Sequence, residues 1–206
     1  MSQFTKNDVK LLNSQTLYSG FFKMVKYSFT HKKYDGSESA LVQREVFERG
    51  HAVAVLAYDR NCEEFVLIEQ FRYPAVPTTD DPWMIEIIAG IIEQGEQEVE
   101  VCKREALEEA GVHLHKITKA LTYLSSPGGT TERLHIYMAE VDANSAEGIH
   151  GLDSESEDIK VLRVSEKQAI AWLCAGKIDN AAAIIALQWF ALNKQELFAR
   201  WDSWED

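Results

Sequence analysis

Residues 90–112 read GIIEQGEQEVEVCKREALEEAGV, a glycine-punctuated loop that runs into an acidic segment. We predict a helix over residues 97–110. Gly111 marks its end, because glycine tolerates the left-handed conformation that follows a last helical turn. Apolar residues recur along this helix at three- or four-residue spacing, the period of a single buried face: Val99, Cys102, Ala106 and Ala110.

Three carboxylates project from neighbouring positions on the predicted helix, because residues three or four apart lie one turn from each other. They belong to Glu105, Glu108 and Glu109. Like charges at this spacing cost a few tenths of a kcal/mol per pair unless something neutralises them. Magnesium or manganese, which prefer hard oxygen ligands, would do so. The alternative is a solvated acidic helix face, which is common in globular proteins.

The whole segment resembles the Nudix box, G-x5-E-x7-R-E-U-x-E-E-x-G-U, in which U is an apolar residue. The resemblance implies an α/β (α+β) Nudix fold, a mixed-sheet α/β/α sandwich with the acidic helix between sheets and an N-terminal antiparallel β region. The two apolar positions hold Ala106 and Val112. All seven specified positions are filled, by Gly90, Glu96, Arg104, Glu105, Glu108, Glu109 and Gly111.

The resemblance also implies a reaction, in which water substitutes at phosphorus in a nucleoside diphosphate linked to another group. Two or three divalent cations would neutralise the pyrophosphate and activate the water. Arg104 would have a positioning role, by pairing with Glu96 or a neighbouring carboxylate. The implied metal ligands are Glu105 and Glu109, with Glu108 assisting, and the backbone carbonyl of Ala89.

Composition limits the partners of this chain. It has 206 residues with a formal net charge of −12, and a surface this acidic repels nucleic acid. No stretch approaches the roughly 18 consecutive apolar residues of a membrane span, and residues 1–10 lack the apolar core of a signal peptide. We predict a cytoplasmic protein with no membrane or nucleic-acid partner. Three cysteines without CxxC spacing are expected to be buried and reduced: Cys62, Cys102 and Cys174.

Residues 1–50 are predicted to form an extended N-terminal region, separate from a catalytic domain over residues 51–206. Tyr27–Lys32 alternates in the manner of a strand, a turn follows at Tyr34–Ser37, and Ala40–Phe47 alternates again. A hairpin this small does not stabilise itself. It must therefore pack on the main body or on a second copy of the chain.

From residue 51 the chain alternates between strand and helix patterns. A buried hairpin is predicted over Ala52–Tyr58 and Glu64–Gln70, and a strand over Trp83–Ile88 that ends at an Ala89-Gly90 break. Further strands are predicted at Ile117–Leu124, Leu134–Val141 and Ile159–Val164. Two helices are predicted at Ser165–Ala175, with Ser165 and Gln168 as a capping box, and at Asp179–Phe198, with Asp179 as N-cap.

Over nearly its whole length the chain is similar to the ADP-ribose pyrophosphatase branch of the Nudix family, the bacterial homodimeric type. The resemblance implies hydrolysis of ADP-ribose to AMP and ribose 5-phosphate. Five segments carry it in order: Glu45–Val53, Glu69–Arg72, Ser126–Arg133, His150–Asp158 and Lys177–Ala181.

In that branch two subunits exchange their N-terminal sheets, which implies a homodimer. Phe21 and Arg44 from opposite subunits would sandwich the adenine, Arg72 would contact the phosphates, and Glu132 would reach substrate or metal. The plainer alternatives are a core position for Phe21, a surface salt bridge for Arg44, and a solvated charge at a strand end for Arg72.

The polar stretch Asp142–Asp158 is expected to be a loop that closes over substrate. By resemblance Glu155 is the general base and Glu157 assists through the metal, although family members place the base differently. Two other functions stay open. Another nucleoside diphosphate sugar, such as GDP-mannose, is one. The other is nucleotide sensing without hydrolysis, but such domains usually lose box carboxylates, and this chain keeps them.

Overall fold

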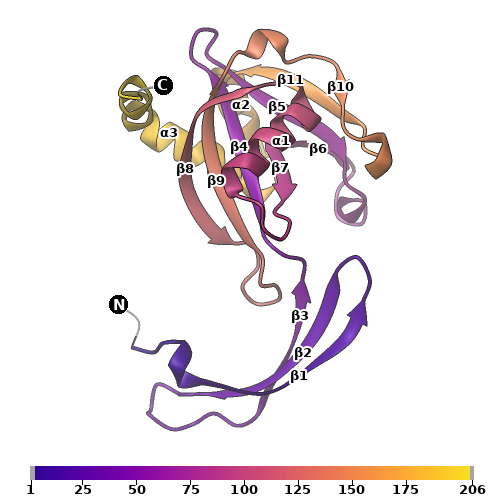
Figure 1. The fold of residues 1–206 in the computed structure, drawn as a ribbon, viewed down its shortest axis with the longest axis vertical. Coiled ribbons are helices and arrows are strands. Elements are labelled where there is room, and N and C mark those ends of the chain that lie inside the picture. The colour runs from indigo at the N-terminus through magenta and orange to yellow at the C-terminus, as the bar shows by residue number, and fades with distance from the viewer. Residues whose placement is uncertain (1–2, 205–206) are drawn as a thin grey trace. The chain divides into compact units, whose positions relative to one another are not determined.

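The computed structural model describes residues 3–204, so the outermost two residues at each end of the two predicted domains lie outside it. The chain forms two compact units (Figure 1). The N-terminal unit contains the chain up to His51 and also Leu124–Arg133, where the Phe47 N–H donates a 2.8 Å hydrogen bond to Gly129 O. The larger unit contains Ala52–Tyr123 and the chain from Leu134 onward.

The N-terminal unit is a three-stranded antiparallel sheet in the order β1-β2-β3. Its strands are β1 (Val9–Ser19), β2 (Lys23–His31) and β3 (Val42–Glu48). The predicted hairpin corresponds to β2 and β3, but β1 was not predicted. Register shifts between Leu11 and Asn13 and between Thr16 and Tyr18 interrupt its period of two, which hides the strand in the sequence.

The larger unit is built on an eight-stranded sheet with the order β10-β11-β5-β4-β9-β8, in which β6 pairs with β5 and β7 pairs with β4. The β4–β9 pair is parallel and the other pairs are antiparallel, so the sheet is mixed, as predicted. The strands are β4 (Ala52–Asp59), β5 (Glu64–Phe71), β6 (Trp83–Glu86), β7 (Ile88–Ile91), β8 (Leu114–Leu124), β9 (Arg133–Val141), β10 (Ile149–His150) and β11 (Ile159–Ser165).

This sheet divides between β4 and β5. The two strands pair only from Ala57–Val66 to Asp59–Glu64, beside the turn that joins them. Further from the turn β4 pairs with β7, while β5 pairs with β6. Helix α1 (Glu98–Ala110) packs against strands of both limbs, in a core that includes Val53 and Ile68. The acidic helix therefore lies between the two limbs of one divided sheet.

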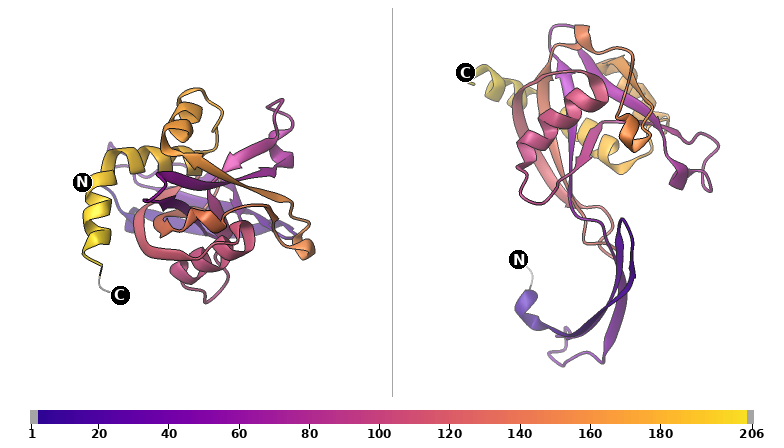
Figure 2. Two further views of the ribbon diagram at one scale, coloured as in Figure 1. Left: turned by 90° about the horizontal axis from the view of Figure 1, so that it is seen from above. Right: turned by 45° about the vertical axis from the view of Figure 1, so that its right-hand side comes forward.

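Alternate residues of β4 face two separate cores. Val53, Val55 and Ala57 point to the side of α1, whereas Ala54 and Leu56 point to the side of α2 and α3. Helix α2 spans Glu166–Cys174 and α3 spans Ala181–Asp202. Figures 1 and 2 show α1 and α3 on opposite sides of the sheet, which makes the larger unit the predicted α/β/α sandwich.

Several predictions of local structure need correction. Ala89 and Gly90 do not break a strand but lie in β7, because they pair with Ala54 and Val53 of β4. The N-cap of α3 is Asn180, not Asp179: its Oδ1 accepts from Ala183 N at 3.1 Å, while its amide donates to Ile85 O at 2.7 Å.

Two more corrections concern side chains. Cys102 is buried as predicted, whereas Cys62 and Cys174 are exposed because they lie in a turn and at a helix end. Ser165 caps α2 by accepting from Gln168 N at 3.3 Å, so one half of the predicted capping box is present. Between residues 3 and 204, no helix has both the length and the apolarity needed to cross a membrane.

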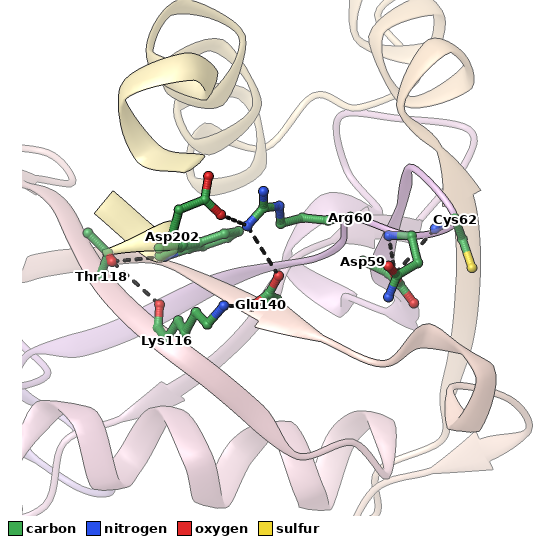
Figure 3. A network of polar contacts seen from close by, with 9 residues as sticks. Asp59, Arg60, Cys62, Lys116, Thr118, Glu140 and Asp202 are labelled. Carbon is green, nitrogen blue, oxygen red and sulfur yellow. Dashed lines mark hydrogen bonds and ion pairs between the residues drawn. The ribbon is translucent and has the colours of Figure 1, made fainter. Parts of the chain in front are cut away.

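A polar network holds the end of α3 on the sheet (Figure 3). Arg60 contacts Asp202 at 2.7 Å and Glu140 at 3.7 Å, and Lys116 reaches the same Glu140 at 2.8 Å. Nearby, the buried indole of Trp201 donates to a threonine hydroxyl of β8 at 3.0 Å. This network fixes the helix that covers the face of the sheet opposite α1.

Candidate active site

Helix α1 positions the acidic cluster, which we define as Glu105, Glu108 and Glu109. Its predicted ends are close to the observed ones, with Gln97 as the N-cap residue. Gly111 follows the last turn with φ of 65°, and its N–H bonds to Leu107 O at 3.1 Å. The left-handed conformation expected of this glycine is therefore present.

Glu109 is the most buried member of the acidic cluster, with 3% of its surface exposed. Its Oε2 accepts a 2.9 Å hydrogen bond from Ala89 N. Burial raises the pKa of Glu109 well above its usual value, and the charges of Glu105 and Glu157 raise it further against the opposing effect of that hydrogen bond. A buried carboxylate in this position lacks a positive partner that would favour its ionised form.

Glu105 lies close to the backbone of Gly90. A Cβ atom on Gly90 would be 1.8 Å from the Glu105 Oε1 atom, so only glycine fits the first position of the box. Burial raises the pKa of Glu105 to about 7; Arg104 opposes this shift, while Glu108 and Glu157 add to it. The loop glycine thus allows a carboxylate to approach the main chain in a crowded, negatively charged place.

Arg104 joins several carboxylates of the box. Its Nη1 lies 2.8 Å from Glu105 Oε1 and 3.0 Å from Glu108 Oε2, and its Nε lies 3.4 Å from Glu96 Oε1. These contacts are the ones that a positioning role for Arg104 requires. They also direct Glu105 and Glu108 toward the guanidinium.

Within residues 3–204, no three acidic, histidine or cysteine side chains are already arranged around a common metal position. Glu109 instead bonds to a main-chain N–H, and Glu105 and Glu108 contact Arg104. The donor set nevertheless fits a hard divalent cation: carboxylate oxygens are the preferred ligands, and the raised pKa values of Glu105 and Glu109 reflect uncompensated negative charge.

Arg72 follows β5 and faces the acidic cluster. Burial disfavours its charge, but the hydrogen bonds from Glu86 and the charges of Glu86, Glu109 and Glu157 together raise the pKa of Arg72. Its guanidinium is bound by Glu86, with Nη2 2.8 Å from Oε2. Arg72 is therefore not the freely solvated charge of the plainer alternative.

The loop before β11 attaches to the end of α1. Gly151 N donates to Glu108 O at 3.1 Å, and the His150 ring lies against Gly111. Glu157 is near enough to raise the pKa of Glu105 and Glu109, and its Oε2 accepts from Leu152 N at 3.2 Å. The structure thus brings Glu157 to the acidic cluster.

Glu155 is placed differently. It ends the short 3₁₀ helix Asp153–Glu155 and is exposed. Its main-chain N–H bonds to Leu152 O at 2.9 Å, and none of the described residues forms a hydrogen bond or ion pair with its carboxylate. Its role as general base stays a prediction.

Three predicted substrate-binding residues belong to the N-terminal unit. Phe21 is 88% exposed, so the alternative core position is wrong. Arg44 lies in β3 and donates to Gln43 O at 2.7 Å; no ion pair to it occurs in residues 3–204, so the predicted alternative of a salt bridge is also wrong. It lines a cavity of about 470 Å³ together with Tyr27 and Phe29. Glu132 pairs with Arg49, 3.1 Å from its Nε.

Two contributors to the site were missed from the sequence: Glu86, which binds Arg72, and Gly151, which docks the loop. Glu86 was passed over as one polar residue in an apolar strand. The register that places it opposite Ile68, near the end of β5, reveals its role. Gly151 has φ of 104°, a conformation that no residue pattern in an irregular loop predicts.

The chain matches known proteins over most of its length. The model of the NUDIX domain matches residues 48–186. An Escherichia coli (strain K12) protein named ADP-ribose pyrophosphatase is 50% identical, covering 96% of this chain and 95% of the relative. A Haemophilus influenzae protein of the same name is 44% identical, over 98% and 94%.

More distant matches extend this picture. A GDP-mannose pyrophosphatase of Cronobacter sakazakii is 33% identical, with 88% of this chain and 94% of the relative covered. The crystal structure of an ADP compounds hydrolase shares the fold, with a TM-score of 0.69 at 19% identity, over 92% of this chain and 96% of that one.

Proposed function

Because the chain belongs to the Nudix family, we propose that it is the enzyme that cleaves the pyrophosphate of ADP-ribose, giving AMP and ribose 5-phosphate. The observation that carries this proposal is the acidic cluster on α1, crowded against Glu157 and faced by the guanidinium of Arg72. Close relatives named for this activity support the choice of substrate.

We propose magnesium as the cofactor, with manganese as a possible substitute. Glu105 and Glu109 would hold it, with help from Glu108, Glu157 and the carbonyl of Ala89. When bound, such cations neutralise the pyrophosphate and lower the pKa of water. Two raised carboxylate pKa values support this assignment, because a divalent cation favours the ionised form of each.

The chain's own residues would bind and orient the substrate. Arg72 binds phosphate oxygens, for which a planar guanidinium is suited, and Arg104 keeps Glu105 and Glu108 in place. Glu155 removes the proton from the water that attacks the adenosyl phosphate, with Glu157 beside it. The exposure of Glu155 supports this role, since a base must meet solvent water.

We propose a homodimer that exchanges its N-terminal sheets. Every residue of β1 is exposed in the single chain, including Leu11 at 59% and Tyr18 at 66%. An apolar strand face of this kind needs a cover, and a second copy would supply one. Phe21 and Arg44 would then enclose the adenine from opposite subunits, and Glu132 would reach the substrate or the metal.

Two details complete the proposal. GDP-mannose is the competing substrate, because relatives of that name are 33% identical over most of the chain. A cytoplasmic location agrees with three cysteines that form no disulfide. A nucleotide sensor without activity is disfavoured by the intact carboxylates of the box.

A phosphatase-coupled assay tests the function directly, because phosphatase releases phosphate from the products and not from intact ADP-ribose. With magnesium, the wild type should turn over ADP-ribose faster than a Glu109→Gln control. A panel that includes GDP-mannose, compared by kcat/KM, should rank ADP-ribose first. Equal rates for wild type and control would contradict the proposed hydrolysis, and a higher kcat/KM for GDP-mannose would contradict the substrate.

A further inference from the structure

Glu86 has no part in the reaction proposed above, yet it is a carboxylate beside an already acidic site. It lies on β6, opposite Ile68 of β5. Arg72 closes the same hairpin, because its main-chain N–H bonds to Pro82 O at 2.9 Å. The backbone of the hairpin therefore brings the Glu86 and Arg72 side chains to the same end of the β5–β6 pair.

The two side chains meet along one edge of the guanidinium. Arg72 Nε lies 3.1 Å from Glu86 Oε1, and Nη2 lies 2.8 Å from Oε2. Among residues 3–204, nothing accepts a hydrogen bond from the remaining nitrogen, Nη1. One edge of Arg72 is thus occupied, and the other is available to an oxyanion ligand.

Glu86 is itself held in place. Its side chain is 14% exposed, and the amide of Gln70 donates to its Oε2 at 3.2 Å. Gln70 is buried in β5. The arrangement is a fixed chain of contacts from Gln70 through Glu86 to Arg72, which reduces the number of rotamers that the arginine samples.

A fixed arginine matters because Arg72 faces carboxylates on two sides. Glu109 and Glu157 both act on its charge, and both are proposed to hold the cation. An arginine free to swing would pair with them and compete with the metal. Glu86 removes that competition by binding the guanidinium from the hairpin side.

We infer that Glu86 is a positioning residue, which holds Arg72 with its Nη1 edge toward the substrate phosphates. This inference rests on the proposed function, and it adds a determinant of substrate affinity. A guanidinium that is already oriented loses less freedom when a phosphate binds. Glu86 touches neither the substrate nor the metal, and it acts only through Arg72.

The test is a double-mutant cycle on Glu86 and Arg72. Glu86→Gln should raise KM for ADP-ribose about tenfold and change kcat by less than about threefold, because an interaction common to ground and transition states is weakened. In an Arg72→Ala background the same substitution should change KM by less than about twofold. Glu86→Asp, which keeps the charge, should give an intermediate KM.

The matched control is Glu64→Gln. Glu64 lies at the other end of β5 and binds Arg163 in the same manner, with Nη2 2.8 Å from Oε2. Removing this charge should leave KM unchanged. A KM for Glu64→Gln that rises as far as that of Glu86→Gln would overturn the inference.

Two further readings separate the inference from other roles of Glu86. The magnesium concentration for half-maximal activity should be unchanged in Glu86→Gln; an increase with KM unaltered would make Glu86 a metal ligand and overturn the inference. An undiminished effect of Glu86→Gln in the Arg72→Ala background would also overturn it.

The proposed function is tested separately by calorimetric binding of ADP-ribose in EDTA, where no turnover occurs. There the same cycle should appear in Kd, with Glu86→Gln weakening binding only when Arg72 is present. This result would uphold the inference even if wild-type hydrolysis failed. A Kd unaffected by Glu86→Gln in the folded protein would overturn it.

Discussion

The Glu109 carboxylate accepts a 2.9 Å hydrogen bond from Ala89 N at a place where the side chain has almost no contact with solvent. One N–H dipole does not replace the hydration that a buried carboxylate loses, so the pKa of Glu109 is raised by burial. The position therefore costs folding free energy in the absence of a cation.

Glu109→Gln should separate stability from activity. The amide oxygen can still accept from Ala89 N, and no buried charge remains. We expect the metal-free variant to be at least as stable as the wild type, and about 1 kcal/mol more stable at alkaline pH. Activity should fall at least about 100-fold, because a cation ligand is lost. Chemical denaturation in EDTA and the phosphatase-coupled assay measure the two effects; a clearly destabilised variant would contradict the account of Glu109.

The stability of the metal-free protein should depend on pH through Glu105. Its folded pKa, raised by burial to about 7, exceeds the usual 4.5, so the folded state binds more protons than the unfolded state. Stability is then highest below about pH 4.5 for this group and decreases as pH rises through about 7. Thermal melts in EDTA across this range should show a falling Tm that magnesium abolishes.

Other carboxylates do not produce this slope. For Asp59, hydrogen bonds from three main-chain N–H groups outweigh burial and lower the pKa, so it stays ionised in both states over the same range. The matched variant is Glu105→Gln, which should flatten the dependence of Tm on pH in EDTA. A slope that persists in this variant would assign the effect to Glu109 or another group.

Gly151→Ala should disturb the loop that carries Glu157. A Cβ atom at residue 151 would lie 2.6 Å from the Glu157 Cβ, so the loop or the glutamate must shift. We expect kcat to fall about tenfold or more, because a small misplacement at an active site has effects of this size. Steady-state kinetics with saturating magnesium provides the measurement.

Gly148→Ala is the control for backbone strain. Gly148 has φ of 93°, close to the 104° of Gly151, but its nearest neighbour is 3.9 Å from the added Cβ. Both variants carry a similar conformational cost of about 1 kcal/mol, and only one carries the clash. Equal losses of kcat would show that strain, and not the position of Glu157, is responsible.

Leu11→Asp should weaken the proposed dimer. Leu11 lies on β1 and is 59% exposed in the single chain, so a charge there costs little in the monomer and opposes burial in an interface. Light scattering should show a shift from dimer toward monomer. Leu192→Asp, on an 85% exposed leucine of α3, should leave the mass unchanged. A monomeric wild type would contradict the dimer itself.

The sequence predicts well those parts of this protein whose cause is local. The period of the apolar residues placed α1, and the spacing of Glu105, Glu108 and Glu109 placed three carboxylates on adjacent faces. The buried hairpin of β4 and β5 followed from two apolar runs and a polar turn. Each of these features depends on residues within a few turns of one another.

Features that depend on distant partners were missed. Ala89 and Gly90 look like a break, but β4 lies beside them and supplies hydrogen bonds. Asn180 was passed over for Asp179 because the choice depends on Ile85, which accepts from the asparagine amide. Glu86 gains its role from Arg72 across a hairpin whose register the composition does not encode. Tertiary pairing decides each of these cases.

The separation of β4 from β5 after three residue pairs has a consequence for how this architecture can diversify. The limb that carries Arg72 and the limb that carries Ala89 share only a short common stem near Asp59. A lengthened turn after Asp59, or a bulge close to it, would tilt one limb against the other and move the arginine relative to the helix. Descendants of one ancestor can in this way accommodate leaving groups of different size while every acidic side chain stays where it was.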